Sequence, residues 1–530
     1  MTSVEKGERN TYLGAKEPKY SILTYTWGRW VDQSRNAPAL PVKGTTWRIP
    51  AVKIEHFSVA SFLRIVDRMG AEDVDWAWID VACIDQENTL IKMDEIGRQA
   101  SVFQNAHRVF LWLSHTSLDL LKTSFSDITR YSFELGCIGT KYGRLSLTVP
   151  ELIDCLCETT NRLLNDPWFS SLWTLQELVL RNDALVLSKE GEDLFLDSEQ
   201  VMSAQSLFMI SLISSCQNAY SLVEGVKLDL EKIERLSVDQ QMTLDQGRTI
   251  MQNIMGAGLY FLFTDNPNVQ YSIAQYRRTS RPEDRVYAIM QVYNLRVGQS
   301  LRPNDAPPLH QLIDEFALAI LSTDPMLGQL FLHTAQPETN KSWRLTQNSR
   351  VPPELMAYKE PSPCCQIGTI LERGTAIATG EYIPFRDLLA LFQQNGDTVD
   401  PDFAFQIMFD DYLVELMGLQ IFPFISITQS SDPDKTWICN NKIACSERGD
   451  RNLFVLLLGD FKDGWNFREK QSDRRNLALV LLKQGFKDAE GSKDHSTFKR
   501  LGLCYWTLQV PDIREQVANL GWKHGSLELC

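Results

Sequence analysis

Two apolar runs on either side of a charged, helix-patterned stretch constrain the fold of this chain more than any other feature. The runs span Trp76 to Ile84 and Arg108 to Leu113, and both have the composition of strands. Between them, from about Thr89 to His107, one apolar stripe recurs at helical spacing: Met93, Ile96, Ala100 and Phe103. Strand, helix and strand at this length predict a βαβ unit with parallel strands and a right-handed crossover.

The flanking sequence extends this unit to a whole α/β domain over residues 1–190. Strands are predicted from Tyr20 to Trp27 and from Ala184 to Ser188. Helices are predicted from His56 to Gly70, from Val149 to about Asn165, and from Phe169 to Arg181. We therefore expect a mainly parallel sheet with flanking helices.

The remaining chain changes character twice. Apolar residues recur at helical spacing over 195–330, which predicts a helical region. Residues 335–363 are rich in proline and polar side chains and favour a linker or a long surface loop. A β-rich C-terminal region is expected over 364–530, with strands at Ile367 to Ile377, Trp437 to Cys445, Leu453 to Leu458, Ala478 to Leu482 and Gly502 to Val510.

Charge and composition exclude several classes of function. The 53 Lys+Arg against 67 Asp+Glu give a formal net charge of −14, and no run of five basic residues occurs, so a nucleic-acid partner is not expected. A membrane-spanning helix needs about 20 consecutive apolar residues, and no stretch of the sequence approaches that length. The 11 scattered cysteines are an odd number, which argues against a disulfide framework and favours a reducing, cytoplasmic location.

Carboxylates stand out in and after the first apolar run. Asp80 lies in its middle, where a buried carboxylate is costly unless it is paired, so it either belongs to a site or holds a neighbouring loop through a partner. Asp85, Gln86 and Glu87 follow the predicted strand at the edge where open α/β sheets bind ligands. Carboxylates are also favoured there simply because they open a helix. Both interpretations remain open.

A third carboxylate, Glu177, lies in the aromatic segment 166–181. Trp173 and Glu177 share one helical face, and Gln176 lies on the neighbouring one. A glutamate beside tryptophans is in reduced dielectric, which tunes a carboxylate for chemistry. Glu177 could equally pair with Arg181 one turn later.

Common catalytic signatures are missing from the chain. It has no Gly-x-Ser-x-Gly, no P-loop, no Gly-x-Gly-x-x-Gly and no His-Glu-x-x-His. Cysteines and histidines do not have zinc-site spacing, so no metal is expected.

Taken together, the motifs resemble those of fungal heterokaryon-incompatibility (HET) domain proteins. The stretches that carry the resemblance are YSILTYTWG at 20–28, WIDVACIDQ at 78–86, VFQNAHRVFLWLS at 102–114 and WFSSLWTLQE at 168–177. RRTSRPEDRVYAIM at 277–290 is similar to a segment that often follows this domain, and HSTFKRLGLCYW at 495–506 is similar to the family's C-terminal tails.

This resemblance implies a role in non-self recognition and programmed cell death. Because the family is a distant relative of TIR domains, some of which cleave NAD, it also implies a TIR/flavodoxin-like parallel sheet. Two departures stand out. Many members have an acidic-basic pair where this chain has Ile91 and Lys92, and many have Asn at the position of Asp85. Glu87 or Glu95 could replace the missing acidic group.

If the domain is an enzyme, the resulting functional prediction is an NAD glycohydrolase with NAD as substrate and no certain cofactor. Glu177 is the first choice for the catalytic carboxylate, Glu87 is the second, and Asp80 orients the loop. Trp27, Asp85, Gln86, Trp173 and Gln176 are predicted to bind the ligand. Two alternatives remain: a non-catalytic interaction module that binds a protein partner or self-assembles, and a HET-like scaffold recruited to a reaction of specialised metabolism.

Overall fold

The computed structural model describes residues 1–4, 11–34, 37–72, 74–138, 147–196, 205–260, 266–388, 406–416, 425–426, 452–463, 474–487, 494–507 and 521–530. The chain divides into two compact units. Unit 1 comprises Met1–Leu262 and Ile273–Leu309, and unit 2 comprises Phe263–Ser272 and His310–Cys530. These units are coarser than the domains predicted from the sequence, whose limits stay a prediction.

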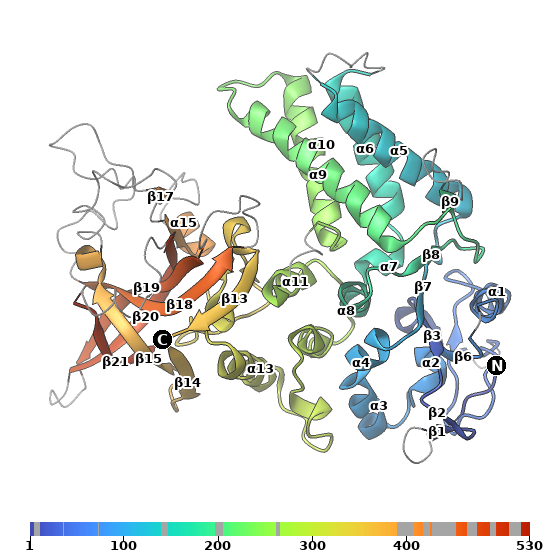
Figure 1. Cartoon of the computed structure of the whole chain (residues 1–530), viewed down its shortest axis with the longest axis horizontal. Coiled ribbons are helices and arrows are strands. Elements are labelled where there is room, and N and C mark those ends of the chain that lie inside the picture. Colours follow the sequence, from blue (N-terminus) through green and yellow to red (C-terminus); the bar gives the residue numbers. More distant parts are fainter. Residues whose placement is uncertain are drawn as a thin grey trace. The chain divides into compact units, whose positions relative to one another are not determined.

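A four-stranded parallel sheet organises unit 1 (Figure 1). Its strand order is β6 (Trp76–Trp78), β3 (Tyr20–Thr24), β7 (Arg108–Trp112) and β8 (Leu185–Leu187). All three pairings are parallel, with β3 between the two strands of the predicted βαβ unit. The mixed α/β fold predicted for this part of the chain is confirmed.

Successive residues of the central strand β7 serve two separate cores. Val109 and Leu111 belong to a core with apolar side chains of four long helices, whereas Phe110 and Trp112 belong to a core with the helix over 59–70. All four side chains are nearly inaccessible to solvent. A strand buried on both faces reads as a continuous apolar run, which is why the sequence signal here is strong.

Helices surround this sheet. Those of unit 1 are α1 (Val59–Gly70), α2 (Asp80–Cys83), α3 (Thr89–Ile96), α4 (Gln99–Gln104), α5 (Leu118–Gly136), α6 (Val149–Leu164), α7 (Pro167–Ser170), α8 (Leu172–Leu180), α9 (Met209–Glu231), α10 (Val238–Gly256) and α12 (Asp284–Tyr287). Short 3-10 helices lie at Gly28–Trp30, Met290–Tyr293 and Gly298–Ser300. Two-stranded pairs are Thr11–Tyr12 with Ala15–Lys16, Val31–Asp32 with Ala51–Val52, and Phe195–Leu196 with Gln205–Ser206.

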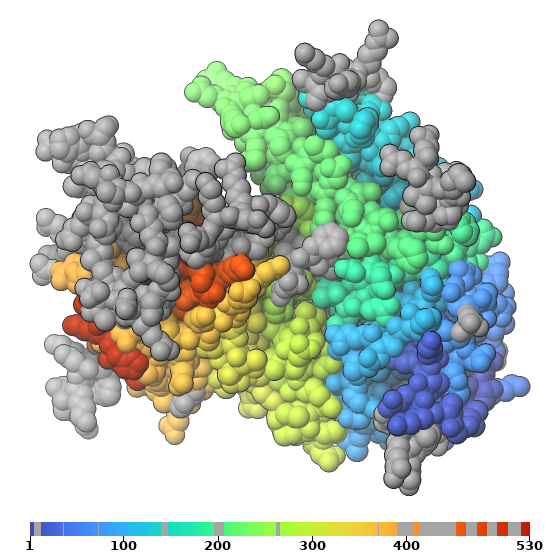
Figure 2. All heavy atoms as spheres, viewed as in Figure 1, coloured from blue at the N-terminus to red at the C-terminus, as the bar shows by residue number. Residues whose placement is uncertain are grey.

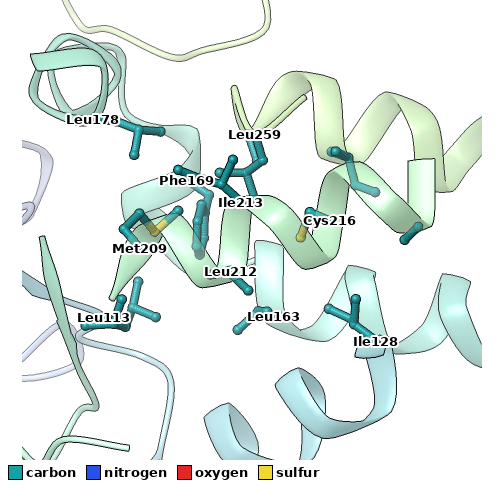
Figure 3. Close-up of a cluster of buried hydrophobic side chains, with 14 of the residues drawn as sticks. Leu113, Ile128, Leu163, Phe169, Leu178, Met209, Leu212, Ile213, Cys216 and Leu259 are labelled. Atoms are coloured by element: carbon teal, nitrogen blue, oxygen red, sulfur yellow. The ribbon is translucent and has the colours of Figure 1, made fainter. Parts of the chain in front are cut away.

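Helices α5, α6, α9 and α10 pack together over one face of the sheet (Figure 1). Figure 3 shows part of their shared core, to which several elements contribute side chains: Leu113, Ile128, Leu163, Phe169, Leu178, Met209, Leu212, Ile213, Cys216 and Leu259. The turn between α9 and α10 lies at the molecular surface, in green in the upper part of Figure 2. Helices α9 and α10, which lie in the segment predicted to be helical, therefore pack onto the α/β sheet.

Three details of the predicted elements are wrong. The run from Trp76 to Ile84 is a strand only as far as Trp78, and Asp80 begins the short helix α2. The helix expected from Thr89 to His107 is two helices, α3 and α4. The helix expected from Phe169 to Arg181 is likewise divided into α7 and α8. Asp80 therefore opens a helix and does not lie in the middle of a strand.

Unit 2 is built on a nine-stranded sheet (Figure 1). Its strands are β13 (Tyr358–Pro363), β14 (Gln366–Ile370), β15 (Ala376–Pro384), β16 (Gln406–Phe409), β17 (Ile425–Ser426), β18 (Leu453–Asp463), β19 (Arg474–Lys487), β20 (Asp494–Thr507) and β21 (Lys523–Leu529). Strands β18, β15, β21, β20 and β19 pair in a closed ring, antiparallel except between β20 and β21. The β-rich C-terminal part is confirmed. The predicted strand from Trp437 to Cys445 lies outside the described residues.

The other elements of this part of the chain are short. They are α11 (Pro267–Ala274), α13 (Leu309–Thr323), α15 (Asp411–Leu416), the pair Leu332–His333 with Ser349–Arg350, and 3-10 helices at Leu327–Gln329 and Pro353–Leu355. Residues 335–363 include the fully buried Trp343 and strand β13. This stretch thus packs within unit 2 and is not a free linker. Among the described residues, no helix has the length and apolar character needed to span a membrane.

Candidate functional site

Asp80 lies directly after β6, at the first residue of α2. Its carboxylate accepts hydrogen bonds from the Trp27 indole at 2.6 Å and from the Val81 backbone at 2.6 Å. Burial raises the pKa of Asp80, and these two donors, the nearby Tyr25 hydroxyl and the Lys92 ammonium counteract that rise. The buried carboxylate that the sequence analysis noted is therefore paired, and it ties the end of β3 to the end of β6.

Glu177 reaches the same region from α8. Its carboxylate accepts a hydrogen bond from the hydroxyl of Thr24, the last residue of β3. The Thr24 hydroxyl in turn accepts from the indole of the buried Trp168 at 2.8 Å. Burial, with a smaller contribution from the charge of Asp80, raises the pKa of Glu177 to about 8, although the Thr24 hydrogen bond lowers it. The predicted pairing of Glu177 with Arg181 is not observed, because Arg181 binds Asp183 and backbone carbonyls instead.

The two carboxylates thus lie within electrostatic reach of each other although they are far apart in sequence. Tyr25 lies between them and feels both charges, and burial raises its pKa well above the ordinary range. Two adjacent carboxyl groups in different environments divide into one that ionises easily and one that holds a proton. Here Glu177 is the one that holds a proton near neutral pH.

The segment after the helical region supplies further groups. Asp284 of α12 accepts hydrogen bonds from the Trp173 indole at 3.2 Å and from the Thr279 hydroxyl at 2.6 Å. Burial, assisted by the charge of Arg281, lowers the pKa of Lys92, whereas Asp284 and Asp80 act in the opposite direction. Lys92 therefore lies between the Asp80 carboxylate and the 281–284 segment.

Arg277 anchors this segment. Its side chain is 1% exposed and donates to the carbonyls of Trp168 and Ser171, each at 3.0 Å, and to the Thr174 hydroxyl at 3.1 Å. It also donates to the carbonyls of Gly256 and Ala257, at the end of α10. One buried guanidinium thereby joins α7, α8, α10 and the returning chain.

The other predicted residues have mostly local roles. The Asp85 carboxylate accepts from the backbone of Glu87 at 2.9 Å and of Asn88 at 3.0 Å, and the Gln86 amide donates to the Ile84 carbonyl at 3.2 Å. The Glu87 side chain is exposed, and no contact of it with Asp80 or Glu177 is recorded among the described residues. This group of residues holds the turn that leads into α3.

Gln176 differs from the other predicted ligand-binding residues. Its side chain is 1% exposed, and neither amide atom has a hydrogen-bond partner among the described residues. Trp27 and Trp173 are only partly buried and hydrogen-bond to Asp80 and Asp284. The predicted ligand-binding residues therefore fall into three parts. Trp27 and Trp173 hydrogen-bond to carboxylates, Gln176 is a buried amide, and Asp85 and Gln86 hold a turn.

Sequence reasoning missed Thr24, Tyr25, Arg281 and Asp284 as members of this constellation. The first two lie inside the quoted motif at 20–28, and the other two lie inside RRTSRPEDRVYAIM. In the first stretch only Trp27 was given a role, and the second stretch was noted only for its resemblance. The available signal at Thr24 was a polar residue at the carboxyl end of an apolar strand.

The fold and site of unit 1 define an α/β domain with two carboxylates at the carboxyl ends of parallel strands. Residues 20–177 match the family described as Heterokaryon incompatibility protein (HET). The chain therefore carries a HET domain, as the resemblance predicted. No curated protein sequence matches this chain. The matched stretch ends at Glu177, so Arg277, Arg281 and Asp284 lie outside it.

Proposed function

We propose that unit 1 cleaves the nicotinamide–ribose bond of NAD, in a protein that acts in non-self recognition and programmed cell death. The observation that carries the proposal is the convergence of Asp80 and Glu177 beside two partly exposed tryptophans, Trp27 and Trp173. Indole rings offer a stacking surface for a flat aromatic leaving group.

This reaction needs few groups. The bond between ribose C1′ and the nicotinamide nitrogen breaks, and its electron pair leaves with nicotinamide, which becomes neutral. Oxocarbenium-like positive charge develops on the ribose, as in glycoside hydrolysis. A carboxylate stabilises that charge, and water then adds to C1′ and passes its proton to a carboxylate. Glu177 is assigned these two roles, and Asp80 holds the Trp27 loop.

The raised pKa of Glu177 fits a cationic substrate. The nicotinamide ring of NAD carries a positive charge, which favours the ionised carboxylate when the substrate binds. In the free protein Glu177 is ionised only above about pH 8. The specificity constant should therefore rise with pH and level off above pH 8.

The test measures NAD loss by the purified full-length protein. Glu177→Gln keeps the shape and the Thr24 contact but removes the charge, and we expect at least a hundredfold lower rate, since such electrostatic contributions are worth about 3 to 4 kcal/mol. The matched control is Glu87→Gln, because this exposed glutamate lies in the neighbouring turn. Intact NAD after prolonged incubation with concentrated wild-type protein would exclude the proposal.

A second candidate is a protein-binding module, supported by apolar residues at the start of α10. Val238 is 85% exposed and Met242 is 54% exposed, and both line a surface hollow of about 600 Å³. Exposed apolar patches of this kind mark interaction surfaces. Light scattering of the wild type and of Val238→Ser/Met242→Ser would decide, because equal monomer masses at all concentrations and with candidate partners would remove this candidate.

A further inference from the structure

A chain of hydrogen bonds between three side chains ends at the Glu177 carboxyl group. The indole nitrogen of Trp168 donates to the Thr24 hydroxyl oxygen at 2.8 Å, and the Thr24 hydroxyl donates to Oε2 of Glu177. Trp168 and Thr24 are buried, whereas the Glu177 side chain is partly exposed. Among the residues that the structure describes, Oε1 of Glu177 has no hydrogen-bond partner. The two oxygens of this carboxyl group are therefore in different environments.

The chemistry of the first two side chains fixes the direction of these hydrogen bonds. An indole N–H is a donor only, and a threonine hydroxyl has one proton and two lone pairs. Thr24 therefore accepts from Trp168, and its single proton is directed at Glu177. If a protonated Oε2 donated to Thr24 instead, the Thr24 proton would be buried without an acceptor in the described part of the chain. A buried donor without an acceptor is unfavourable, so Oε2 is the acceptor whether or not Glu177 carries a proton.

Contacts of the Trp168 backbone and ring hold the indole in this position. Its backbone nitrogen donates to the Asp166 carboxylate at 3.0 Å. Its carbonyl accepts from the Arg277 guanidinium at 3.0 Å and from the Thr174 hydroxyl at 2.6 Å. The ring packs edge-on against Phe169, with the two ring centres 5.3 Å apart. Because Arg277 lies outside the stretch matched by the family, a later segment of the chain supports the position of Trp168.

We propose that Trp168 and Thr24 are positioning residues that act on Glu177 through a one-way hydrogen-bond relay. The relay keeps Oε2 an acceptor, so Oε1 is the oxygen that takes up and releases the proton. This inference deepens the proposed function, on which it rests for the reaction that uses that proton. In that reaction the water oxygen bonds to ribose C1′ and the water proton passes to Oε1, while Oε2 keeps the same donor. No hydrogen bond of the relay has to reorient during the step, which is the advantage of a preorganised site.

Two other titratable groups interact with Glu177, and neither belongs to the relay. Asp80 lies at the start of α2, and Tyr25 follows Thr24 in the chain. The Asp284 carboxylate of α12, which packs against α8, accepts two hydrogen bonds of its own. A substitution at Thr24 therefore removes a hydrogen bond of Glu177 and leaves the neighbouring charges in place.

Infrared spectroscopy of the full-length protein as a function of pH tests the relay without any substrate. The carbonyl band of the protonated Glu177 carboxyl group is identified by its loss in Glu177→Gln. Thr24→Val keeps the shape of the side chain and removes the hydroxyl. We expect this variant to release the Glu177 proton about one to two pH units higher than the wild type, as follows from loss of a hydrogen bond to a charged group. Its carbonyl band should also move to higher frequency, because Oε2 loses its donor.

Three further variants complete the test. Thr24→Ser restores the hydroxyl and should keep the wild-type titration and band. Trp168→Phe removes the indole donor and should raise the pKa of Glu177 by a smaller amount than Thr24→Val, since a hydroxyl that accepts one hydrogen bond is a stronger donor of another. Thr160→Val is the matched control, because Thr160 is fully buried on α6 and donates to the Leu156 carbonyl of its own helix at 2.7 Å. Circular dichroism verifies the fold of every variant.

The outcomes separate the relay from the proposed function. A shift in Thr24→Val no larger than that in Thr160→Val would overturn the relay, whether or not NAD is cleaved. Equal titrations of Trp168→Phe and the wild type would do the same, because the direction of the relay rests on the indole donor. If the infrared pattern holds while NAD stays intact, the relay stands and the glycohydrolase proposal falls. If NAD is cleaved, the pH at which kcat/KM levels off should move upward in Thr24→Val by the same amount, and an unmoved profile would contradict the positioning role of Thr24.

Discussion

Replacing Glu177 by Gln should stabilise unit 1, and the gain should grow with pH. Burial raises the pKa of Glu177 from its usual 4.5 to about 8. Between these two values the unfolded chain has released the proton and the folded chain has kept it, so stability falls as pH rises through this window. Above about pH 8 the ionised carboxylate remains buried at its full cost. Glutamine keeps a neutral side chain of the same shape and avoids that cost.

The magnitude follows from the two pKa values. Each unit of difference between the folded and unfolded pKa is worth about 1.4 kcal/mol, so the cost above pH 8 is about 5 kcal/mol as an upper bound. At pH 4.5 and below, the expected difference between variant and wild type is close to zero. A stability gain from replacing a buried carboxyl group by a neutral amide is typical of a residue that is retained for function.

Hydrogen exchange of the full-length protein measures this effect locally. Peptides that cover β3 and α8 report the opening free energy of the region that contains Thr24 and Glu177. We compare wild type, Glu177→Gln and Glu158→Gln at pH 5, 7 and 9, because Glu158 is 71% exposed on α6 of the same unit. A gain for Glu177→Gln that is the same at all three pH values, or a loss at pH 9, would refute the reasoning.

Two further predictions concern buried basic side chains of unit 1. Burial lowers the pKa of His56 to about 4 despite its hydrogen bond with the Thr26 carbonyl. The unfolded chain therefore takes up a proton before the folded chain does, and the free energy of unfolding should fall by about 3 kcal/mol as pH decreases from about 6.5 to 4. In acid titrations followed by circular dichroism, His56→Phe should lose stability less steeply with pH than the wild type, and an equal pH dependence would count against this assignment. Arg277→Met should lower the free energy of unfolding by about 3 kcal/mol or more, because the substitution leaves several buried carbonyls without donors. Urea unfolding at pH 7 measures this loss. A loss no larger than that of Arg64→Gln, a substitution of an exposed arginine on α1, would contradict the anchoring role.

Prediction from sequence succeeded where one segment carries its own signal. Strands β3, β7 and β8 and helices α1 and α6 were found because buried parallel strands are continuous apolar runs and amphipathic helices repeat every three to four residues. It failed at residues 79–84, which are as apolar as a strand. Only three residues of β6 pair with β3 before the chain turns into α2. Apolar runs of this length do not distinguish a strand from a buried helical turn.

The site shows the same division. Asp80 and Glu177 were named from sequence because each is a carboxylate among apolar or aromatic neighbours. Glu87 was named for its place after a strand, yet its side chain is exposed, and its backbone nitrogen donates to the Asp85 carboxylate in the turn before α3. Neither spacing nor composition indicated that Lys92 and Asp284 would meet near Asp80.

The sequence by itself determined the class of unit 1 and the chemical groups available to it. Local patterns encode secondary structure, and side-chain types encode which charges and hydrogen bonds are possible. Only the tertiary structure decided that Glu177 keeps its proton, because that depends on burial by β3 and α8 and on the charge of Asp80. It also decided that residues 277–284 join a domain matched only over residues 20–177, since Arg277 holds them there through carbonyls distant in sequence. Burial and electrostatic interaction act through space, and therefore no segment read alone contains them.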